Sequence, residues 1–348
     1  MKVSFTGPAM RHMDRGAGYG EASWNIFRTF EKAGLDVDIE TKNADIEISF
    51  ADPGNYTWLS PASYKIAYSA WESTDMKPSF IARMKQADEV WATSPWTKSV
   101  YDALLPNKEV MVYKHGINER WKPRKRKQRG KPFTFLHIGE PYSRKDGQLV
   151  VDTFIELFGD NPDYRLVMKC SRMNTTRVKH PTQGWSGSPS AIYDNIITIN
   201  GMLSPEQMEG LYEQCDVFVY PSWGEGFGFQ PLEALASGMP VISTYGWADY
   251  AKYITWPVDA TWEPSPWTDV HQGYMMKPVR SHFKEQMINA VNEYEDVLSE
   301  TFRNSFDIHR EYDWDLVSEP AIAKVKSIIN SLENERKNFN LSNLKKRA

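Results

Sequence analysis

Short apolar runs alternate with stretches of helical hydrophobic spacing over the first 113 residues. Residues 2–5 are typical of a first strand, and within 21–33 the rings of Trp24, Phe27 and Phe30 recur at helical spacing before Gly34. The same alternation predicts further strands at 35–39, 46–50, 65–69, 89–92 and 110–113, and helices at 79–87 and 96–105. Strands that alternate with helices favour a parallel α/β sheet.

The pattern restarts after a basic, proline-flanked segment at 122–132, which marks a boundary between two units. Strands are predicted at 133–138, 165–168, 196–199, 216–220 and 241–243, and helices at 148–158, 205–214 (capped by Ser204), 229–237, 284–298 and 319–332. Two doubly wound halves joined by one linker predict a bilobal protein, and ligands of such sheets bind outside the carboxyl ends of the strands. The polar tail at 334–348 predicts partial disorder.

Composition bounds the class of protein. The 348 residues carry 41 Lys and Arg against 45 Asp and Glu, a formal net charge of −4, which argues against a surface that binds nucleic acid or anionic membrane all over. Two distant cysteines, Cys170 and Cys215, exclude a disulfide framework and indicate a reducing compartment. The start is too short and polar for a signal peptide, and no run reaches the length of a membrane span. We therefore expect a cytoplasmic protein, with a peripheral membrane position or a phage-infected host cytoplasm as alternatives.

Aromatic residues are abundant: 13 Trp, 17 Tyr and 16 Phe, many of them beside Gly and Pro in expected loops. Such rings stack on sugars or bases, although most rings fill cores. The rings alone do not show where a ligand would lie; the glycine-rich string at 221–233 gives a more specific indication.

The densest chemical signal is the string 221–233, PSWGEGFGFQPLE. An apolar strand there leads into a glycine-rich turn that opens a helix, whose free amides favour a phosphate or a partly negative oxygen. Glu225 and Glu233 would then face one cleft, where carboxylates accept hydrogen bonds from vicinal hydroxyls. The alternative is that both are acids that stabilise the start of the helix.

This string, continued to 244 as ALASGMPVIST, resembles the signature of the retaining glycosyltransferases of family four, in which two glutamates are separated by seven residues. Segments 135–154, 199–222 and the HGIN of 115–118 are similar to further parts of that family. The resemblance implies the GT-B fold, in which two Rossmann-like domains face each other across a cleft. It implies an acceptor-binding domain at 1–121, rejoined by a helix at 315–348, and a donor-binding domain at 133–314.

Residue by residue, the resemblance also implies a donor site for a nucleotide-diphosphate sugar. Glu225 would hold sugar hydroxyls, Glu233 the ribose, and Lys145 with Arg144 the diphosphate, whose charge grows as it departs. The positions expected to bind the donor are Gly139, Arg144, Lys145, Gly201, Met202, Glu225, Gly226, Phe227, Gly228 and Glu233. This chain has Glu140 where the family has an arginine after the glycine, so either Arg144 takes over that contact or the donor is held in another way.

The acceptor side is expected in the first domain. Gly16, Gly18, Tyr19 and Gly20 lack the GxGxxG spacing of a dinucleotide site, and the resemblance implies a loop that closes over both substrates; the alternative is a plain loop with a helix cap. Glu72 stands where the family often has a cleft histidine, and Trp71 beside it is a candidate to stack on an acceptor ring. His115 is a second catalytic candidate. Structural roles for Glu72 and His115 remain open.

No metal or other cofactor is expected. The two acidic pairs, Asp36 with Asp38 and Asp313 with Asp315, resemble metal-binding pairs of another glycosyltransferase fold but lie at a strand end and a helix start. We interpret them as structural acids.

The leading hypothesis is retaining transfer from a nucleotide-diphosphate sugar to a hydroxyl of a saccharide or a lipid-linked saccharide. The first alternative is transfer to hydroxylated bases of phage DNA, held by the seven basic residues of 122–131, with Trp71 or Trp96 stacked on an extruded base. A solvated linker explains the same residues, and a basic patch also suits an anionic membrane. A non-catalytic nucleotide-sugar-binding module and a sugar-nucleotide epimerase remain further alternatives.

Overall fold

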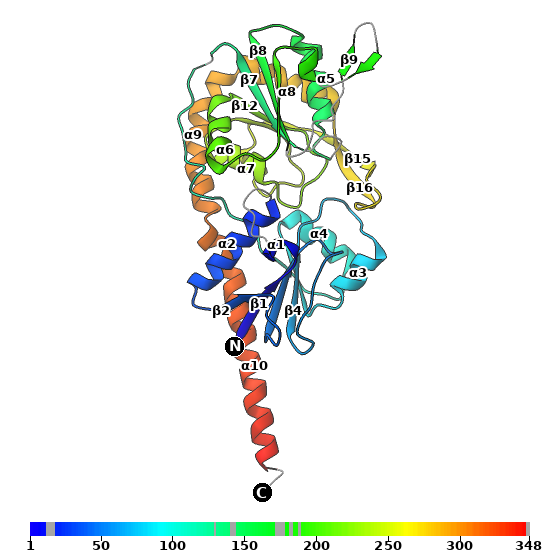
Figure 1. Cartoon of the computed structure of the whole chain (residues 1–348), viewed down its shortest axis with the longest axis vertical. Helices are drawn as coiled ribbons and strands as arrows, with labels where there is room; N and C mark the ends of the chain where they lie inside the picture. The colour runs from blue at the N-terminus through cyan, green and yellow to red at the C-terminus, as the bar shows by residue number, and fades with distance from the viewer. Residues whose placement is uncertain are drawn as a thin grey trace.

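The chain folds into two lobes stacked along the long axis of the molecule (Figure 1). The computed structural model describes residues 1–11, 18–128, 130–139, 144–170, 178–180, 184–186 and 189–345. Each lobe contains a six-stranded sheet, and every paired strand in both sheets is parallel. This is the α/β architecture that the alternating pattern predicts.

The first lobe has the strand order β2-β1-β3-β4-β5-β6. Its strands are β1 (Lys2–Thr6), β2 (Asp36–Ile39), β3 (Ile46–Phe50), β4 (Tyr64–Ser69), β5 (Glu89–Ala92) and β6 (Val110–Val112), and its helices are α1 (Pro8–Arg11), α2 (Gly18–Lys32), α3 (Pro78–Met84) and α4 (Pro95–Leu104). All five residues of β3 are buried, as expected for a central strand covered on both faces.

The second lobe has the order β11-β8-β7-β12-β13-β14. Its strands are β7 (Phe133–Ile138), β8 (Tyr164–Cys170), β11 (Ile196–Asn200), β12 (Val217–Tyr220), β13 (Val241–Thr244) and β14 (Trp256–Val258), with the short β9 (Val178–His180), β10 (Gly184–Ser186), η1 (Pro189–Ala191) and η2 (Ala251–Tyr253). Its helices are α5 (Gly147–Phe158), α6 (Pro205–Gln214), α7 (Phe229–Ala236), α8 (Arg280–Asn292) and α9 (Tyr294–Glu311). Ser204 and Gln207 form a capping box at the start of α6, which explains why that helix begins where the sequence predicts.

The last helix, α10 (Trp314–Lys345), leaves the second lobe and packs on the first (Figure 1). Trp314, Val317, Ala321 and Val325 are buried in one cluster with the apolar residues of β1, β3 and α2. The Tyr113 hydroxyl, just after β6, lies 2.8 Å from the Ser318 hydroxyl. The core of the first lobe is therefore completed by residues from the far end of the chain.

A two-stranded hairpin links the lobes on another side. It consists of β15 (Ala260–Pro264) and β16 (Tyr274–Pro278), which pair antiparallel after β14. The backbone amide of Thr74 donates to Tyr274 O at 3.0 Å, and the amide of Tyr274 donates to Thr74 Oγ1 at 2.8 Å. The ring of Trp262 stacks on Trp96 of α4, with centroids 5.7 Å apart. The hairpin thus belongs to the second lobe and is bound to the first lobe by these hydrogen bonds and this ring contact.

Three differences separate this fold from the sequence predictions. The helix expected at 284–298 is two helices, α8 and α9, which break at Glu293 so that the buried Tyr294 packs edge-on against Phe133 at 5.2 Å. The tail expected to be partly disordered is helical as far as Lys345. The hairpin was not predicted, because prolines end both of its strands and a nine-residue loop replaces a tight turn.

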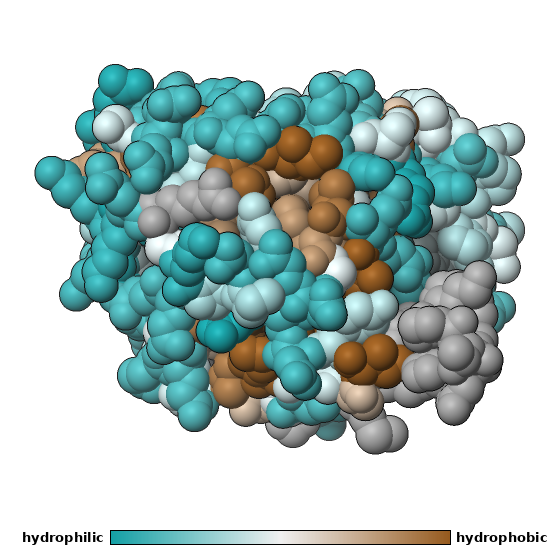
Figure 2. Space-filling model, turned by 90° about the horizontal axis from the view of Figure 1, so that it is seen from above, coloured by the Kyte–Doolittle hydropathy of each residue, from teal (hydrophilic) through white to brown (hydrophobic). Residues whose placement is uncertain are grey.

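The surface is mostly polar at the outer end of the second lobe. Figure 2 looks down on this end, where hydrophilic residues cover most of the view and hydrophobic ones show in small areas near its middle. Within the part of the chain that the structure describes, no helix is long and apolar enough to cross a membrane.

Candidate active site

Glu225 lies in the loop between β12 and α7, at the carboxyl edge of the second sheet. The Tyr220 hydroxyl donates to Glu225 Oε1 at 2.8 Å, and the Ser222 hydroxyl donates to the same oxygen at 3.0 Å. The residue is only 5% exposed. A carboxylate fixed in this way accepts hydrogen bonds in one defined direction, which suits recognition of a hydroxyl group.

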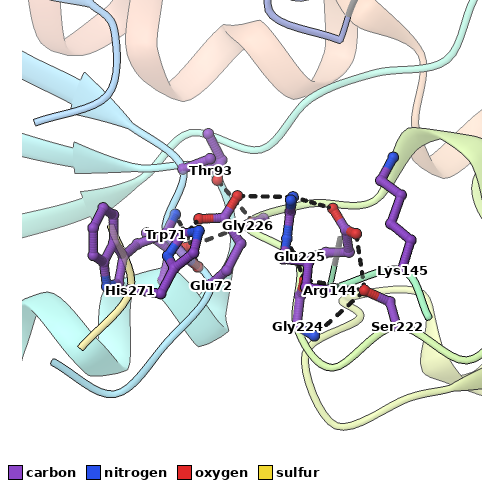
Figure 3. A network of polar contacts seen from close by, with 12 residues as sticks. Trp71, Glu72, Thr93, Arg144, Lys145, Ser222, Gly224, Glu225, Gly226 and His271 are labelled. Atoms are coloured by element: carbon purple, nitrogen blue, oxygen red, sulfur yellow. Dashed lines mark hydrogen bonds and ion pairs between the residues drawn. The ribbon is translucent and has the colours of Figure 1, made fainter. Parts of the chain in front are cut away.

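Arg144, which follows β7, joins the two lobes through its guanidinium group (Figure 3). Nη2 donates to Glu225 Oε2 and to Glu72 Oε1, at 2.9 Å in each case. Nε donates to the carbonyl of Gly224 at 2.8 Å. Glu72 belongs to the first lobe, in the segment between β4 and α3, so loops that follow strands of both sheets meet at one arginine.

The charges of this cluster support one another. Burial alone would lower the pKa of Arg144, but the charges of Glu225 and Glu72 raise it above its usual value. Burial opposes the ionisation of Glu225, and the charges of Arg144 and Lys145 hold the pKa of Glu225 below its usual value. Both groups therefore stay ionised at neutral pH, and the ion pair is partly shielded from water.

Gly224 and Gly226 are needed where the lobes touch. A Cβ atom on Gly224 would lie 2.3 Å from Glu72 O, and one on Gly226 would lie 2.3 Å from the Cβ of Ala70. The Thr93 hydroxyl donates to Gly226 O at 2.8 Å, which ties the loop to the end of β5. Bare backbone is therefore required here for the approach of the first lobe.

The next two residues predicted to bind the donor are packed against the second lobe. Phe227 is 3% exposed and lies edge-on to the rings of His115 and Tyr250. Gly228 has a φ of 82°, and its carbonyl accepts a hydrogen bond from the Tyr250 hydroxyl. Donation from their amides to a donor sugar stays a prediction.

Glu233 lies in α7, beyond the first turn. The Tyr212 hydroxyl donates to its Oε2 at 3.1 Å. Burial raises the pKa of Glu233 from 4.5 to about 7, and the charge of Glu21 in the first lobe adds to the shift. Lys145 lies on the same side, with Nζ 3.4 Å from Gln230 Oε1 and 5.4 Å from the ring centre of Tyr220. Lys145 and Glu233 thus both contact residues near the start of α7, and their donor-binding roles stay predictions.

The remaining donor positions follow the carboxyl ends of β7 and β11. The Gly139 amide donates to Lys169 O at 3.0 Å. Gly201 has a φ of 96° with open space around its Cα, and the side chain of Met202 is 55% exposed. All three lie at the edge of the sheet expected for a ligand. Glu140 lies outside the described residues.

The predicted closing loop is partly helical. Helix α2 begins at Gly18 rather than at residue 21, and α1 lies before it. A Cβ on Gly18 would lie 3.5 Å from the ring of Phe229 at the start of α7. Tyr19 packs on Phe50 with centroids 4.9 Å apart, and Gly20 is buried. Gly16 lies outside the described residues.

Two of the aromatic candidates, Trp71 and His115, are buried. Trp71 is 1% exposed, its Nε1 donates to Asp75 O at 3.1 Å, and its ring lies edge-on to Phe80, so its face does not offer an acceptor a stacking surface. His115 is 3% exposed and stacks on Phe229 at 5.1 Å. Burial lowers the pKa of His115 to about 3, so the ring is neutral at physiological pH. Its surroundings favour the packing role that the sequence left open.

His271 was missed by the sequence predictions, although it lies beside Glu72 (Figure 3). It belongs to the 265–273 loop of the hairpin, and its Nδ1 is 3.7 Å from Glu72 Oε2. Its ring is tilted against Trp71, with centroids 5.1 Å apart. Burial lowers the pKa of His271, and the charge of Arg144 acts in the same direction against the opposing effect of Glu72. No local motif marks this residue, because its partner is about 200 positions earlier in the chain.

The basic segment does not line the meeting point of the lobes. Arg126 donates to Cys215 O at 3.2 Å and to Ser237 Oγ at 3.1 Å, which fixes the segment along the flank of the second lobe. Arg124 forms ion pairs with Glu209 and Glu213 of α6. Arg124 and Arg126 are therefore engaged by the second lobe itself, and these contacts give the DNA alternative no support.

The acidic pairs have structural partners. Asp36 and Asp38 form ion pairs with Lys2, at 3.7 and 3.3 Å. Asp313 accepts a hydrogen bond from the amide of Asp315 at 2.9 Å, at the start of α10. Among the described residues, no group of three or more His, Cys, Asp or Glu side chains is placed to hold a metal ion.

Comparisons with known proteins agree with this arrangement. Residues 132–253 match the family model described as glycosyl transferases group 1. The chain is 26% identical over 146 residues to the D-inositol 3-phosphate glycosyltransferase of Corynebacterium kroppenstedtii, a match that covers 41% of this chain and 32% of that protein. It is 23% identical over 242 residues to putative glycosyltransferase 45 of Sulfolobus islandicus filamentous virus, covering 67% of this chain and 64% of that protein. The chain thus spans less than two thirds of the length of each of these relatives.

A solved structure extends the likeness to both lobes. The sucrose-phosphate synthase from Thermosynechococcus elongatus superposes with a TM-score of 0.65 at 12% identity, covering 96% of this chain and 100% of that chain. At this identity the likeness concerns the fold, which is GT-B, as the resemblance implies. Residues 132–253 therefore match the glycosyl transferases group 1, and the two lobes together have the GT-B fold.

Proposed function

We propose that the chain transfers a glycosyl group from a nucleotide-diphosphate sugar to a hydroxyl of a saccharide acceptor, with retention of the anomeric configuration. The observation that carries the proposal is the cluster of Glu72, Arg144 and Glu225, in which residues of both lobes meet at the carboxyl edges of the two sheets. Lys145 follows Arg144 in the chain, and Glu233 lies in α7, the helix that follows Glu225. The family resemblance assigns both positions to donor binding.

Each donor group meets side chains of matching chemistry. Glu225, held by Tyr220 and Ser222, would accept hydrogen bonds from the sugar hydroxyls. Glu233 would accept hydrogen bonds from the ribose hydroxyls. Lys145 would neutralise the diphosphate, and Arg144 would join it by exchanging one carboxylate for a phosphate oxygen. With two cations at this position, we propose that transfer needs no metal ion.

The reaction we propose is a front-face displacement. The acceptor oxygen forms a bond to the anomeric carbon on the face from which the diphosphate oxygen leaves, and the hydroxyl proton passes to the departing diphosphate. Lys145 and Arg144 stabilise the negative charge that develops on the leaving group. Closure of the two lobes excludes water, which would otherwise hydrolyse the donor.

A saccharide hydroxyl suits the first lobe better than a phosphate-rich polymer. The charged group that this lobe contributes to the cluster is the carboxylate of Glu72, which accepts hydrogen bonds and repels phosphate. The basic segment that would attract a nucleic acid lies along the flank of the second lobe instead.

The test is release of nucleoside diphosphate from UDP-, GDP-, ADP- and TDP-sugars. Each donor is assayed alone, with the methyl α- and β-glycosides of glucose, galactose and mannose, and with duplex DNA that contains hydroxymethylated bases. We expect one donor to react faster with a methyl glycoside than alone, and proton NMR of the product to show the anomeric configuration of the donor. An inverted product contradicts retention.

Variants then test the donor site. Lys145→Met and Glu233→Gln should each weaken donor binding about 10-fold or more, the effect of removing one hydrogen bond to a charged group. Lys252→Met, whose side chain pairs with Glu311 and is 60% exposed, should not change it. Turnover of the donor without any acceptor indicates an epimerase, binding without turnover indicates a non-catalytic module, and reaction on DNA alone restores the nucleic-acid alternative.

A further inference from the structure

One carboxylate oxygen of Glu72 faces a side-chain nitrogen to which it is not hydrogen-bonded. Its Oε1 accepts the hydrogen bond from Arg144, while Oε2 faces His271 Nδ1 at 3.7 Å. That separation is too long for a hydrogen bond between the two atoms. Nδ1 is buried and has no hydrogen-bond partner among the described residues. A buried polar atom without a partner is costly, so a site of this kind favours a bound polar group.

The two residues come from different lobes, and the hairpin sets their separation. Close to His271, the Thr74 amide donates to Tyr274 O and the Tyr274 amide donates to Thr74 Oγ1, which ties the hairpin to the first lobe. Gly273 has a φ of 76°, and a Cβ there would lie 2.5 Å from Thr74 Oγ1. The pair of Glu72 and His271 is therefore assembled when the hairpin docks on the first lobe.

We propose that Glu72 and His271 together bind the acceptor hydroxyl that attacks the donor. The inference rests on the proposed function and names the residues that select its acceptor. A hydroxyl donates one hydrogen bond and accepts others, so it matches an acceptor-only carboxylate beside an imidazole N–H. An oxygen about 2.8 Å from each of two atoms that are 3.7 Å apart satisfies both contacts. A phosphodiester lacks the proton that Glu72 requires, and its negative charge is repelled by the carboxylate.

The charges around His271 fit this role. The ionisable groups that face it are Glu72, Arg144 and Glu225. Burial lowers the pKa of His271, with Arg144 acting in the same direction and the two carboxylates opposing it. The ring is therefore neutral at physiological pH, and it does not close on Glu72 as an ion pair.

The position also fits the donor side. The same Nη2 of Arg144 that binds Glu72 binds Glu225, the residue proposed to hold the donor sugar. Only one guanidinium nitrogen therefore lies between Glu72, which would bind the acceptor hydroxyl, and Glu225, which would bind the donor sugar. When Arg144 turns toward the diphosphate, Glu72 still accepts the hydrogen bond of the bound hydroxyl; during transfer that proton turns from Glu72 to the departing diphosphate oxygen.

The test compares two amides that differ by one methylene. In His271→Asn the side-chain nitrogen occupies the place of Nδ1, whereas in His271→Gln it occupies the place of Nε2. With the methyl glycoside that wild type uses fastest, we expect His271→Gln and His271→Ala to raise the acceptor KM about 10-fold and His271→Asn to raise it about 3-fold or less. The donor KM and the rate of donor hydrolysis without acceptor should not change. Val270→Ala, on the same loop and 48% exposed, is the matched control.

A second measurement uses the unaltered protein. In 1H–15N NMR of 15N-histidine-labelled chain, the methyl glycoside should shift the Nδ1 resonance of His271 more than its Nε2 resonance. Equal acceptor KM values in wild type and all three His271 variants, or no shift at Nδ1, overturns the inference while transfer by wild type leaves the proposed function standing. Failure of wild type to release nucleoside diphosphate with any donor and acceptor overturns both.

Discussion

The carboxylates of Glu72 and Glu225 are linked through one nitrogen of Arg144, at 2.9 Å on each side. One of these acids belongs to the first lobe and the other to the second. Arg144 thus forms an ion pair with the buried carboxylate of Glu225 in its own lobe and a second ion pair with Glu72 in the neighbouring lobe. The ion pair within the second lobe and the contact between lobes can be separated by mutation.

Replacing Arg144 should destabilise the fold through Glu225. Because Glu225 is 5% exposed, Arg144→Met leaves a buried carboxylate without its nearest cation, and the free energy of unfolding should fall by about 3–5 kcal/mol. Urea denaturation followed by tryptophan fluorescence measures the change. The double variant Arg144→Met/Glu225→Gln should recover most of the loss, and a double variant as unstable as the sum of the two single variants would contradict this account.

Glu233 should make stability depend on pH in the direction opposite to most carboxylates. Its pKa is raised from 4.5 to about 7, so the folded chain binds this proton more tightly than the unfolded chain does. The free energy of unfolding should therefore fall as pH rises through this window, by at most about 3 kcal/mol. Glu233→Gln removes this term, so urea unfolding should show the variant gaining stability relative to wild type between pH 4.5 and pH 8. A constant difference would argue that Glu233 titrates normally.

Gly226→Ala should hold the two lobes apart. The added methyl group would lie 2.3 Å from the Cβ of Ala70, and no positive φ at Gly226 complicates the comparison. We expect a larger radius of gyration in small-angle X-ray scattering and a transfer rate lowered about 100-fold, because the substrates are then misaligned. Gly210→Ala on α6, where the nearest atom would be 3.9 Å away, should change neither. Scattering curves that coincide for both variants would refute the prediction.

The basic segment should matter for stability rather than for binding. Arg126 donates to Cys215 O and to Ser237 Oγ, so Arg126→Met should cost about 2–4 kcal/mol in thermal or urea unfolding. Lys127 is exposed, and Lys127→Met should change stability by less than about 0.5 kcal/mol and leave transfer to a methyl glycoside unaltered. If Lys127→Met instead weakened binding to duplex DNA in a salt-dependent way, the nucleic-acid alternative would regain support.

Most of the fold could be predicted from periodicity, because central parallel strands are continuous apolar runs and the intervening helices have clear caps. The strands at 46–50, 89–92 and 133–138 and the helix at 205–214 agree with the structure to the residue. The break at Glu293 could not be predicted, since helical spacing continues through it and the contacts at the break, Trp256 Nε1 with Glu293 and Tyr294 with Phe133, come from distant parts of the chain.

The candidate site, too, contains residues that the sequence could predict and residues that it could not. Glu225 and Glu233 lie on one continuous motif, so sequence spacing alone could single out the pair; that both face one cleft stays a prediction. Trp71 and His271 depend on which surfaces the two lobes bury against each other, and local sequence does not contain that information. Trp71 was expected to be exposed and is covered, whereas His271 had no motif and lies beside Glu72.

The return of α10 to the first lobe has a consequence for how the chain is made. The second lobe, from β7 to the end of α9, is contiguous in sequence and contains its own core clusters. The first lobe must wait for Trp314, Val317 and Ala321, which are synthesised after the whole second lobe. Although domains usually fold in order from the N-terminus, we expect this chain to finish its second lobe before the first lobe is complete.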